Sequence, residues 1–335
     1  MRLGIIGVGK MGFNHVRIFS QMKKVHIVGI ADVNEPLAHE VAQEFNTCGY
    51  TDYRELLDQN LDAVSIVVPT SMHKQCTMDA LAAGCHVLVE KPISNTIENG
   101  KEMILAAQKT GKKLLVGHVE RFNPAVGILK EIIDDMVLGD IVSISSKRVG
   151  PYAPRITDSG IILDLAPHDI DVISYLYGDR VREVYAVAGK TFHSQEDHAT
   201  LMLKFRKGTA GVIETSWLPP HRVRKLNVVG NMGVASLDFL EQKVIVYDKN
   251  WAREAKVDRA EPLRNELSYF IRLASNGDTP IVTGEDSLHA LSVALTSIES
   301  YRTGRVLKVP LPNIAENTSK VTSLDKKRGA GEQQK

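Results

Sequence analysis

The sequence has few cysteines, almost no net charge and no long hydrophobic run, and each absence narrows the choice of function. The three cysteines (Cys48, Cys76 and Cys85) are odd in number and lack C-x-x-C spacing. This argues against a disulfide framework and a bound metal, and favours a cytoplasmic setting. The net charge of +1 gives no reason to expect nucleic acid or a membrane surface as a partner. No apolar stretch approaches the roughly 18 residues of a membrane-spanning helix.

The chain is long enough for two domains. Its 335 residues are 43% hydrophobic and 24% charged, as is usual for a globular protein. From the motifs below we expect an NAD-binding domain over residues 1–120 and a substrate-binding and oligomerisation domain over residues 121–315. Residues 316–335 are polar and short of large apolar side chains, so we expect a disordered tail there.

A glycine motif near the N-terminus has the spacing of a dinucleotide-binding loop. An apolar strand leads into Gly7, Gly9 and Gly12, which form G-x-G-x-x-G at the start of a helix. Gly7 permits the tight turn, Gly9 lets the backbone approach a pyrophosphate, and Gly12 lets the helix pack on the strand. Asp32 ends the next strand, 20 residues after Gly12, where an acid grips an adenosine ribose. The alternative is a glycine-rich turn with an unrelated helix cap at Asp32.

Two patterns of secondary structure follow one another along the chain. Strands alternate with helices up to about residue 117, which predicts a doubly wound parallel sheet. Beyond residue 140, long β runs with short turns predict an antiparallel sheet. In this second part, helices are predicted at 125–138, 161–177, 263–275 and 285–301, and strands at 141–149, 181–190, 199–206, 210–217, 224–229, 234–239, 243–247 and 305–309.

The stretch 85–92, read CHVLVEKP, ends a predicted buried strand with charged residues. Glu90, Lys91 and Pro92 follow that strand, and ligands of a parallel sheet bind outside the carboxyl ends of its strands. Pro92 fixes its own φ and pushes Lys91 toward an extended conformation. Lys91 is therefore placed to meet a bound ligand. The alternative is a solvated surface lysine.

A second group of chemically active residues lies at 164–171, read DLAPHDID. Asp164 and His168 are four residues apart and share one face if the segment is a continuous helix. Pro167 favours a helix that begins close to it, which would leave Asp164 in the preceding turn. A histidine beside carboxylates can accept a proton. The alternative is that these residues cap a helix.

Together these motifs resemble those of the glucose-fructose oxidoreductase, inositol dehydrogenase and rhizopine catabolism (Gfo/Idh/MocA) family. The resemblance rests on GVGKMG (7–12), on PTSMH (69–73) leading to GCHVLVEKP (84–92), and on DLAPHDID (164–171), and covers residues 1 to about 312. It implies an N-terminal Rossmann domain and a C-terminal α/β domain with a large open antiparallel sheet, often used for oligomer contacts. At Ser159-Gly160 members often carry two or three glycines, which affects only the expected loop.

The resemblance also implies the residues of the site. Lys91 and His168 flank the substrate beside the nicotinamide, with Asp164 assisting. The residues implied to bind NAD are Gly7, Gly9, Lys10, Met11, Gly12, Asp32, Pro69, Thr70, His73, Glu90 and Lys91.

The segment 118–124, read HVERFNP, looks like a subgroup that oxidises C3 of nucleotide-linked N-acetyl sugars, such as UDP-N-acetylglucosamine 3-dehydrogenases. A diphosphate needs cationic donors, and Arg121, Arg148 and Arg155 lie in segments expected near the site. The alternative for each arginine is that it is solvated or pairs with a nearby acid. The predicted substrate-binding residues are Lys91, Arg121, Asn123, Tyr152, Arg155, Asp164 and His168.

We therefore predict an NAD-dependent dehydrogenase that oxidises a secondary alcohol of a sugar, with UDP-N-acetylglucosamine as the preferred substrate. His168 is the preferred base and Lys91 holds the oxygen, although the two roles can be exchanged. The alternatives are a dehydrogenase of a free cyclitol or monosaccharide, and a regulator of the same fold that binds NAD(H) without turnover. Apolar strands with few helices to cover them predict a homo-oligomer, dimer or tetramer, formed through the exposed face of the second sheet.

Overall fold

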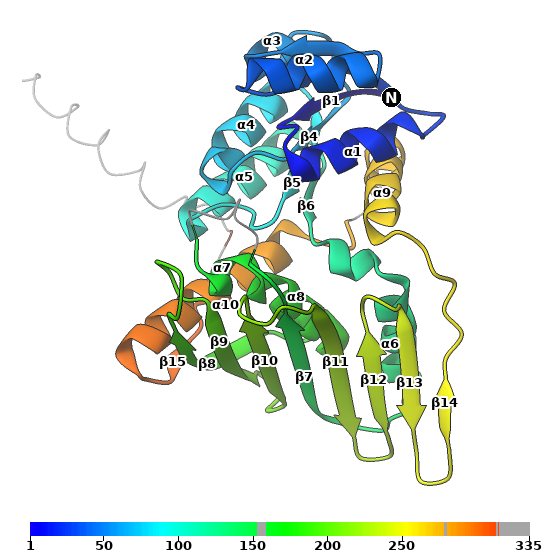
Figure 1. Ribbon diagram of the computed structural model, residues 1–335, viewed down its shortest axis with the longest axis vertical. Helices are drawn as coiled ribbons and strands as arrows, with labels where there is room; N and C mark the ends of the chain where they lie inside the picture. Colours follow the sequence, from blue (N-terminus) through cyan, green and yellow to red (C-terminus); the bar gives the residue numbers. More distant parts are fainter. Residues whose placement is uncertain (153–158, 278–279, 313, 315–335) are drawn as a thin grey trace, which may run out of the picture.

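The computed structural model describes residues 1–152, 159–277, 280–312 and 314. Within these residues the chain forms a six-stranded and a nine-stranded sheet, each with its own helices. The first sheet and its helices lie above the second in Figure 1, and the segment after β6 leads from one to the other. Arg155 and the predicted tail at 316–335 lie outside the described residues.

The first sheet is parallel throughout and has the order β3-β2-β1-β4-β5-β6. The strand order reverses at β1, which pairs with β2 on one side and β4 on the other, so a crevice opens at the carboxyl ends of these strands. Its elements are β1 (Arg2–Ile6), α1 (Lys10–Ser20), β2 (His26–Ala31), α2 (Glu35–Glu44), β3 (Cys48–Tyr50), α3 (Tyr53–Leu57), β4 (Ala63–Ile66), α4 (Thr70–Ala82), β5 (His86–Glu90), α5 (Ile97–Thr110) and β6 (Leu114–Gly117). The predicted doubly wound parallel sheet is confirmed.

The second sheet has the order β14-β13-β12-β11-β7-β10-β9-β8-β15. Its neighbouring strands run antiparallel, apart from β7 and β10, so the sheet is mixed at one pairing. The strands are β7 (Ile141–Val149), β8 (Val181–Gly189), β9 (His198–Phe205), β10 (Ala210–Ser216), β11 (Val223–Gly230), β12 (Val234–Asp238), β13 (Lys243–Tyr247), β14 (Ala252–Glu254) and β15 (Leu307–Lys308). The helical elements are the 3-10 turn η1 (Val119–Phe122), α6 (Pro124–Asp134), α7 (Ile161–Asp164), α8 (Ala166–Tyr177), α9 (Pro262–Asn276) and α10 (Gly284–Thr303).

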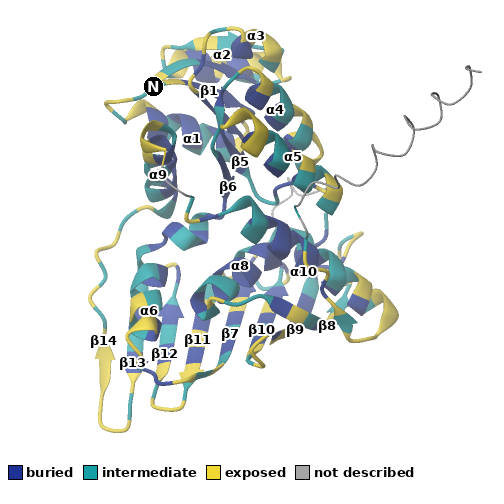
Figure 2. Cartoon of the chain, turned by 180° about the vertical axis from the view of Figure 1, so that it is seen from behind, coloured by how far each residue is buried: buried dark blue, intermediate teal, exposed yellow. Residues whose placement is uncertain are grey.

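Helices cover only one face of the second sheet. In Figure 2, α6, α8 and α10 lie in front of the strands, and buried residues concentrate between them and the sheet. The strands alternate accordingly: along β9, Leu201 and Leu203 are buried, whereas Met202 and Lys204 are exposed. The opposite face carries no helix among the described residues, as Figure 1 shows.

Helix α9 returns from the second sheet to the first domain. Its Leu267 and Phe270 are fully buried in a cluster with Leu3 and Val16 of that domain, and α9 lies beside α1 in Figure 1. The domain boundary near residue 120 stays a prediction, but residues far beyond it help to build the first core. Among the described residues, no helix combines the length and the apolar composition needed to cross a lipid bilayer.

The expected helix 161–177 is broken. Helix α7 ends at Asp164, α8 begins at Ala166, and Pro167 lies in the first turn of α8, where its missing N–H costs no hydrogen bond. The expectation that the helix begins near Pro167 is therefore correct. Asp164 and His168 belong to two different helices and do not share one helical face.

Candidate active site

The glycine loop leaves room for a ligand at one position and packs tightly at the others. Gly7 has a φ of +88°, and a Cβ built there would lie 2.4 Å from the Val67 carbonyl oxygen. A Cβ on Gly12 would lie 2.0 Å from the Gly7 carbonyl oxygen. A Cβ on Gly9 would meet no heavy atom of the described residues within 4 Å. The backbone at Gly9 therefore stays open to a bound group, as a pyrophosphate requires.

Helix α1 presents its N-terminus at this opening. Gly9 is its N-cap and offers no side chain to the first backbone N–H groups, and no acid lies in the first turn. The predicted Lys10 and Met11 are the first two residues of this helix. An uncapped helix N-terminus favours a phosphate, so the donors present here fit the diphosphate of a dinucleotide.

Asp32 lies immediately after β2 with its carboxylate beside the glycine loop. Its Oδ2 accepts from the backbone N–H of Val8 at 2.9 Å, and its Oδ1 accepts from Asn34 N–H at 2.9 Å. The neighbouring Val33 is 94% exposed and brings no positive charge. The carboxylate is thus fixed where the ribose of an adenine dinucleotide is bound in folds of this kind.

The residues predicted after β4 lie at the same edge of the sheet. Pro69 is the N-cap of α4, and Thr70 begins that helix. His73 is buried; its Nδ1 is 2.9 Å from the Pro92 carbonyl and its Nε2 is 3.0 Å from the Val68 carbonyl. Burial lowers the pKa of His73 although both carbonyl contacts raise it. This side chain ties the start of α4 to the segment that follows Lys91.

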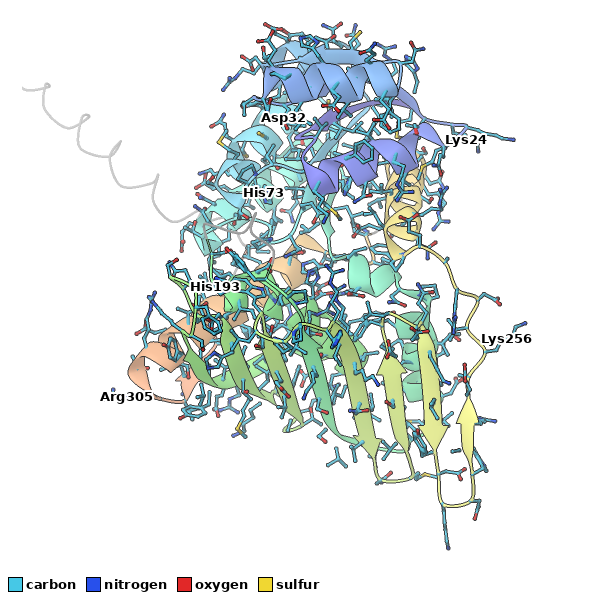
Figure 3. All side chains as sticks on the ribbon, viewed as in Figure 1. Lys24, Asp32, His73, His193, Lys256 and Arg305 are labelled. Carbon is cyan, nitrogen blue, oxygen red and sulfur yellow. The ribbon has the colours of Figure 1, made fainter. Side chains whose placement is uncertain are left out.

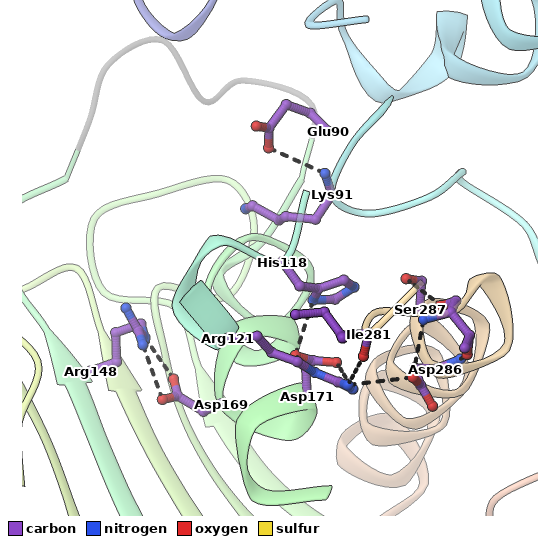
Figure 4. A network of polar contacts seen from close by, with 11 residues as sticks. Glu90, Lys91, His118, Arg121, Arg148, Asp169, Asp171, Ile281, Asp286 and Ser287 are labelled. Atoms are coloured by element: carbon purple, nitrogen blue, oxygen red, sulfur yellow. Dashed lines mark hydrogen bonds and ion pairs between the residues drawn. The ribbon is translucent and has the colours of Figure 1, made fainter. Parts of the chain in front are cut away.

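Glu90 ends β5 and packs its carboxylate against Gly117 of β6. His15 Nε2 lies 3.3 Å from Glu90 Oε1, while His15 Nδ1 contacts Ser65 Oγ at 2.8 Å. Glu90 Oε2 accepts from the Lys91 backbone N–H at 3.2 Å (Figure 4). Burial raises the pKa of Glu90, but contact with His15 outweighs it and the pKa lies below its ordinary value. Glu90 thus orients the turn that carries Lys91.

Lys91 bridges the two domains. Its Nζ donates to the Asp164 carbonyl oxygen at 2.7 Å and to Asp164 Oδ1 at 3.3 Å. The side chains of Lys91 and Asp164 are only 16% and 17% exposed. Lys91 is therefore held in the crevice and is not a solvated surface lysine.

His168 lies in the first turn of α8 and is half-buried. Its Nδ1 is enclosed, with no hydrogen-bond partner among the described residues. Burial lowers the pKa of His168 well below its ordinary value, and the charges of Lys91 and Arg148 lower it further. The imidazole is therefore neutral and can accept a proton. Lys91 thus contacts Asp164 directly and acts on His168 through its charge, while the catalytic roles of the three residues stay predictions.

Two of the three predicted arginines, Arg121 and Arg148, are engaged in ion pairs (Figure 4). Arg148 donates from Nε to Asp169 Oδ2 at 2.7 Å and from Nη1 to Glu120 Oε1 at 2.8 Å, with its side chain 2% exposed. Arg121 donates to both oxygens of Asp171, at 2.7 and 2.6 Å. For these two residues the alternative of pairing with nearby acids holds, and both side chains are largely buried, at 7% and 2% exposed.

Asn123 also has a structural contact. Its side chain accepts from Ala125 N–H at the start of α6 and donates to the Phe239 carbonyl oxygen at 3.1 Å. The substrate-binding roles of Arg121 and Asn123 stay predictions, and so does that of Arg155.

Tyr152 belongs to an aromatic cluster that the sequence did not indicate. Its ring centroid lies 3.9 Å from that of His193 and 5.1 Å from that of Trp217. Figure 3 places His193 at the edge of the second sheet that faces the first domain. His193 and Trp217 could not be predicted from the sequence, because residues from three separate segments meet only in the fold.

A second histidine near Lys91 was also missed. His118 follows β6 directly and is 2% exposed, with its Nδ1 3.7 Å from Asp171 Oδ2. In Figure 4 it lies between Lys91 and Asp171. The sequence held a signal for His118, because it is the first residue after β6 just as Lys91 is the first residue after β5.

A Rossmann sheet with a dinucleotide loop and a Lys–His pair at its carboxyl edge defines an NAD-binding oxidoreductase. Two family models match: the oxidoreductase family with an NAD-binding Rossmann fold over residues 1–118, and the GFO/IDH/MocA C-terminal domain over residues 127–236. The chain belongs to the GFO/IDH/MocA family, as the resemblance of its motifs indicated.

Its relatives act on different substrates. The chain is 31% identical over 249 residues to the UDP-N-acetylglucosamine 3-dehydrogenase of Acidithiobacillus ferrooxidans, covering 74% of this chain and 77% of the relative. The solved structure of that enzyme matches with a TM-score of 0.84 at 28% identity, over 90% of this chain and 98% of the other. The myo-inositol 2-dehydrogenase of Thermotoga maritima is 28% identical over 332 residues, which cover 92% and 98% of the two chains.

Proposed function

We propose that the protein oxidises a secondary alcohol of a sugar to a ketone, with NAD as the oxidant. The proposal depends on one observation: Lys91, at the carboxyl end of β5, contacts Asp164, and its charge acts on His168. When bound, NAD accepts the hydride from the carbinol carbon. The chain must then remove the hydroxyl proton and stabilise the developing negative charge.

The geometry suggests a division of roles. The neutral His168 accepts the hydroxyl proton, because it is half-buried beside the charge of Lys91 and its environment keeps it unprotonated. Lys91 Nζ, anchored by Asp164, donates a hydrogen bond to the oxygen and stabilises its charge. The reverse assignment uses the same atoms, so kinetics of single variants must distinguish the two.

For the substrate we propose UDP-N-acetylglucosamine, oxidised at C3. The HVERFNP segment and the relative from Acidithiobacillus ferrooxidans support it. Since Arg121 and Arg148 are paired and buried, the more exposed cations offered to a diphosphate are Arg222 and Arg224, although Arg224 also lies 3.7 Å from Glu120. Arg224 is 35% exposed, its charge acts on His168, and Arg222 packs against Gly150. The stacked Tyr152 and its neighbours could hold the base or the sugar.

A comparison of substrates tests this choice. UDP-N-acetylglucosamine, free N-acetylglucosamine and myo-inositol are each offered with NAD, and NADH formation is followed by absorbance. Binding of the UDP part should raise kcat/KM strongly over that of the free sugar. Equal efficiency with free sugar or inositol would remove the nucleotide sugar as substrate.

A free cyclitol is the second candidate. The myo-inositol 2-dehydrogenase of Thermotoga maritima matches 92% of this chain, more than the 74% matched by the nucleotide-sugar relative. The alternative of another class, an NAD(H)-binding regulator without turnover, predicts no NADH with any sugar. The retained Lys91–Asp164 contact and His168 favour an enzyme.

We also propose that the open face of the second sheet joins copies of this chain into a dimer or tetramer. Val229, Val234 and Tyr247 are neighbours across β11, β12 and β13, and are 38%, 36% and 42% exposed. Met202 on β9 is 58% exposed beside Tyr185 and Val212. Apolar rows of this extent mark an interaction surface.

A further inference from the structure

His118 is a buried titratable residue for which the proposed reaction has no role so far. It stands at the carboxyl end of β6, next to the strand whose end carries Lys91. Its side chain is 2% exposed, and among the described residues neither ring nitrogen has a hydrogen-bond partner within normal distance. Burying an imidazole without hydrogen-bond partners costs stability, so its presence here calls for an explanation.

Asp171 gives this imidazole a fixed negative neighbour. Its Oδ2 lies 3.7 Å from His118 Nδ1, and the carboxylate is held by two hydrogen bonds from Arg121. Arg121 in turn donates to the Ile281 carbonyl oxygen and contacts Asp286 of α10 (Figure 4). Because the carboxylate can only accept, the tautomer that suits this contact carries its proton on Nδ1, and Nε2 can then accept another.

His168 is in the opposite situation. The charges that act most strongly on it are positive, from Lys91, Arg148 and Arg224, and Lys91 already occupies Asp164. A proton taken from the substrate is therefore poorly held on His168. His118 lies close enough for its charge to act on His168, and Asp171 is three residues after His168 on α8, on a neighbouring part of the same helix surface.

We propose that His118, backed by Asp171, is a relay residue that receives the reaction proton from His168 and delivers it to the cavity between α8 and α10. The inference rests on the proposed dehydrogenase function. In that reaction the carbinol hydrogen leaves carbon as a hydride, with both electrons of its bond, and is accepted by NAD. The oxygen–hydrogen bond loses its proton, and its electron pair forms the second bond of the ketone. The proton moves to His168 and then to His118 Nε2, while His118 releases the proton on Nδ1 toward Asp171.

The cavity supplies the way out. Its volume is about 290 Å³, enough for several water molecules. Asp171 contacts His118 on one side and lines this cavity on the other, and Gly178 at its rim is exposed. The charged and titratable residues that line the cavity are Arg121, Asp171, Tyr175, Asp179, Arg180, Asp286 and His289.

Charges from every side act on His118, and their balance decides its titration. Burial lowers the pKa of His118, Asp171 and Asp286 raise it, and Arg121 and Lys91 lower it. The charges of His118 and His168 on α8 also act on each other, and those of Glu266 of α9 and Asp171 do so too. Among the two histidines, only His118 has an acid as its strongest charged neighbour, so it is the better proton acceptor.

The first test needs neither cofactor nor substrate. Hydrogen exchange at the imidazole C2 position, measured by mass spectrometry over a pH series, reports the protonation of each histidine separately. His118 should titrate at higher pH than His168, and Asp171→Asn should lower the titration of His118 by about one pH unit or more, as expected for the loss of an adjacent charge. Asp171→Glu, which keeps the charge and the partner of Arg121, should leave it high. Titration of His118 below His168, or no response to Asp171→Asn, overturns the relay.

The second test uses the turnover of the complete enzyme. His118→Ala should lower kcat about 10²-fold at neutral pH with little change in KM, and the deficit should shrink at higher pH as hydroxide takes the proton directly. Added imidazole should restore kcat in His118→Ala but not in His118→Phe, whose ring fills the space. His39→Asn, at an exposed site, serves as the control.

An unchanged kcat and pH profile in His118→Ala, or a loss that imidazole does not restore, contradicts the relay. If no sugar reduces NAD with the wild-type protein, the proposed activity is wrong, and the exchange experiment alone decides whether His118 and Asp171 form the predicted pair.

Discussion

Lys91 contacts Asp164 of the second domain and its charge acts on His168, so the loss of either Lys91 or His168 should affect chemistry more than cofactor binding. Replacing Lys91 or His168 by Ala should lower kcat by about 10²–10⁴-fold and leave the Kd for NAD nearly unchanged. If the two act as one unit, the double variant should lose little more than the worse single variant. Lys23→Ala, at an exposed lysine away from the crevice, is the control. Near-wild-type turnover in both single variants would refute the assignment.

Asp32 should make the enzyme prefer NAD to NADP. Its carboxylate is anchored on Val8 N–H and would accept from the ribose hydroxyls but repel a 2′-phosphate. The next residue is the exposed Val33, which offers that phosphate no cation. We expect a higher kcat/KM with NAD than with NADP, and a smaller ratio in Asp32→Asn. An equal or better kcat/KM with NADP would show that the carboxylate does not select the cofactor.

Glu266 should contribute less to the stability of the folded protein at neutral pH than in acid. Both carboxylate oxygens are buried without a hydrogen-bond partner among the described residues. Burial raises the pKa of Glu266 well above its ordinary value, and Glu90 raises it further. In the unfolded chain Glu266 releases this proton around the ordinary glutamate pKa of about 4.3, whereas the folded protein keeps it to higher pH. Stability is therefore lost as the pH rises through this window.

The variant Glu266→Gln removes that proton equilibrium. At pH 7 it should melt a few degrees above the wild type, about the shift that 1–2 kcal/mol gives a protein of this size. Near pH 4 the variant and the wild type should melt at the same temperature. Differential scanning calorimetry at the two pH values measures this. A Tm difference that is the same at both pH values would mean that ionisation of Glu266 is not the cause.

The position of a single residue could be predicted from the sequence when its neighbours in the chain determine it, and not when distant residues do. Lys91 and Asp32 follow strands directly, so their place at the sheet edge could be read from the chain. The partners of Arg121 and Arg148 lie far along the chain, in Asp171 and Asp169, and the pairing is visible only in the fold. An arginine near a site in sequence is therefore poor evidence for a free cation in that site.

Among the elements, the break between α7 and α8 matters most for the site. The chain turns at Leu165, so the carbonyl of Asp164 stays accessible to Lys91 Nζ, at 2.7 Å. A continuous helix would have used that carbonyl for its own hydrogen bond to residue 168. Pro167 allowed the break between the two helices to be predicted from the sequence, but the contact of Asp164 with Lys91 depends on how the two sheets are placed.

Helix α9 should be as important for the first domain as its own helices. Phe270 is fully buried in the cluster that contains Leu3 and Val16. Phe270→Ala should lower the free energy of unfolding by about 3–5 kcal/mol, through lost burial and a cavity. Val306→Ala, at a residue that is 63% exposed, is the control and should change little. Urea unfolding followed by circular dichroism measures both variants, and a loss below 1 kcal/mol in Phe270→Ala would contradict this role.

The sequence could not indicate this use of α9. Its apolar residues have the spacing of an amphipathic helix, which predicts a buried face but not the sheet that buries it. Glu261 at its start pairs with Arg17 of α1, a contact between residues at opposite ends of the chain. Alternation of strands and helices established the first sheet, whereas the return of a late helix to it is a property of the tertiary structure.

For the whole molecule, the two faces of the second sheet differ in what they can contact. One face is closed by α6, α8 and α10, and the other carries apolar side chains with no helix over them among the described residues. Across its centre, Lys147 of β7 pairs with Glu214 of β10, so the apolar rows flank a charged strip. A second copy placed face to face can match apolar rows with apolar rows and charges of opposite sign, as a two-fold interface requires.

The substitution Met202→Glu should separate such an oligomer. Met202 is 58% exposed at the middle of one apolar row, and a carboxylate there would be buried without a partner in the interface. Light scattering at micromolar concentration should give a dimer or tetramer for the wild type and a smaller species for Met202→Glu. Met136→Glu makes the same chemical change at a site that is 54% exposed after α6, and should leave the mass unchanged. A monomeric wild type, or an oligomer that Met202→Glu leaves intact, would show that this face is not the interface.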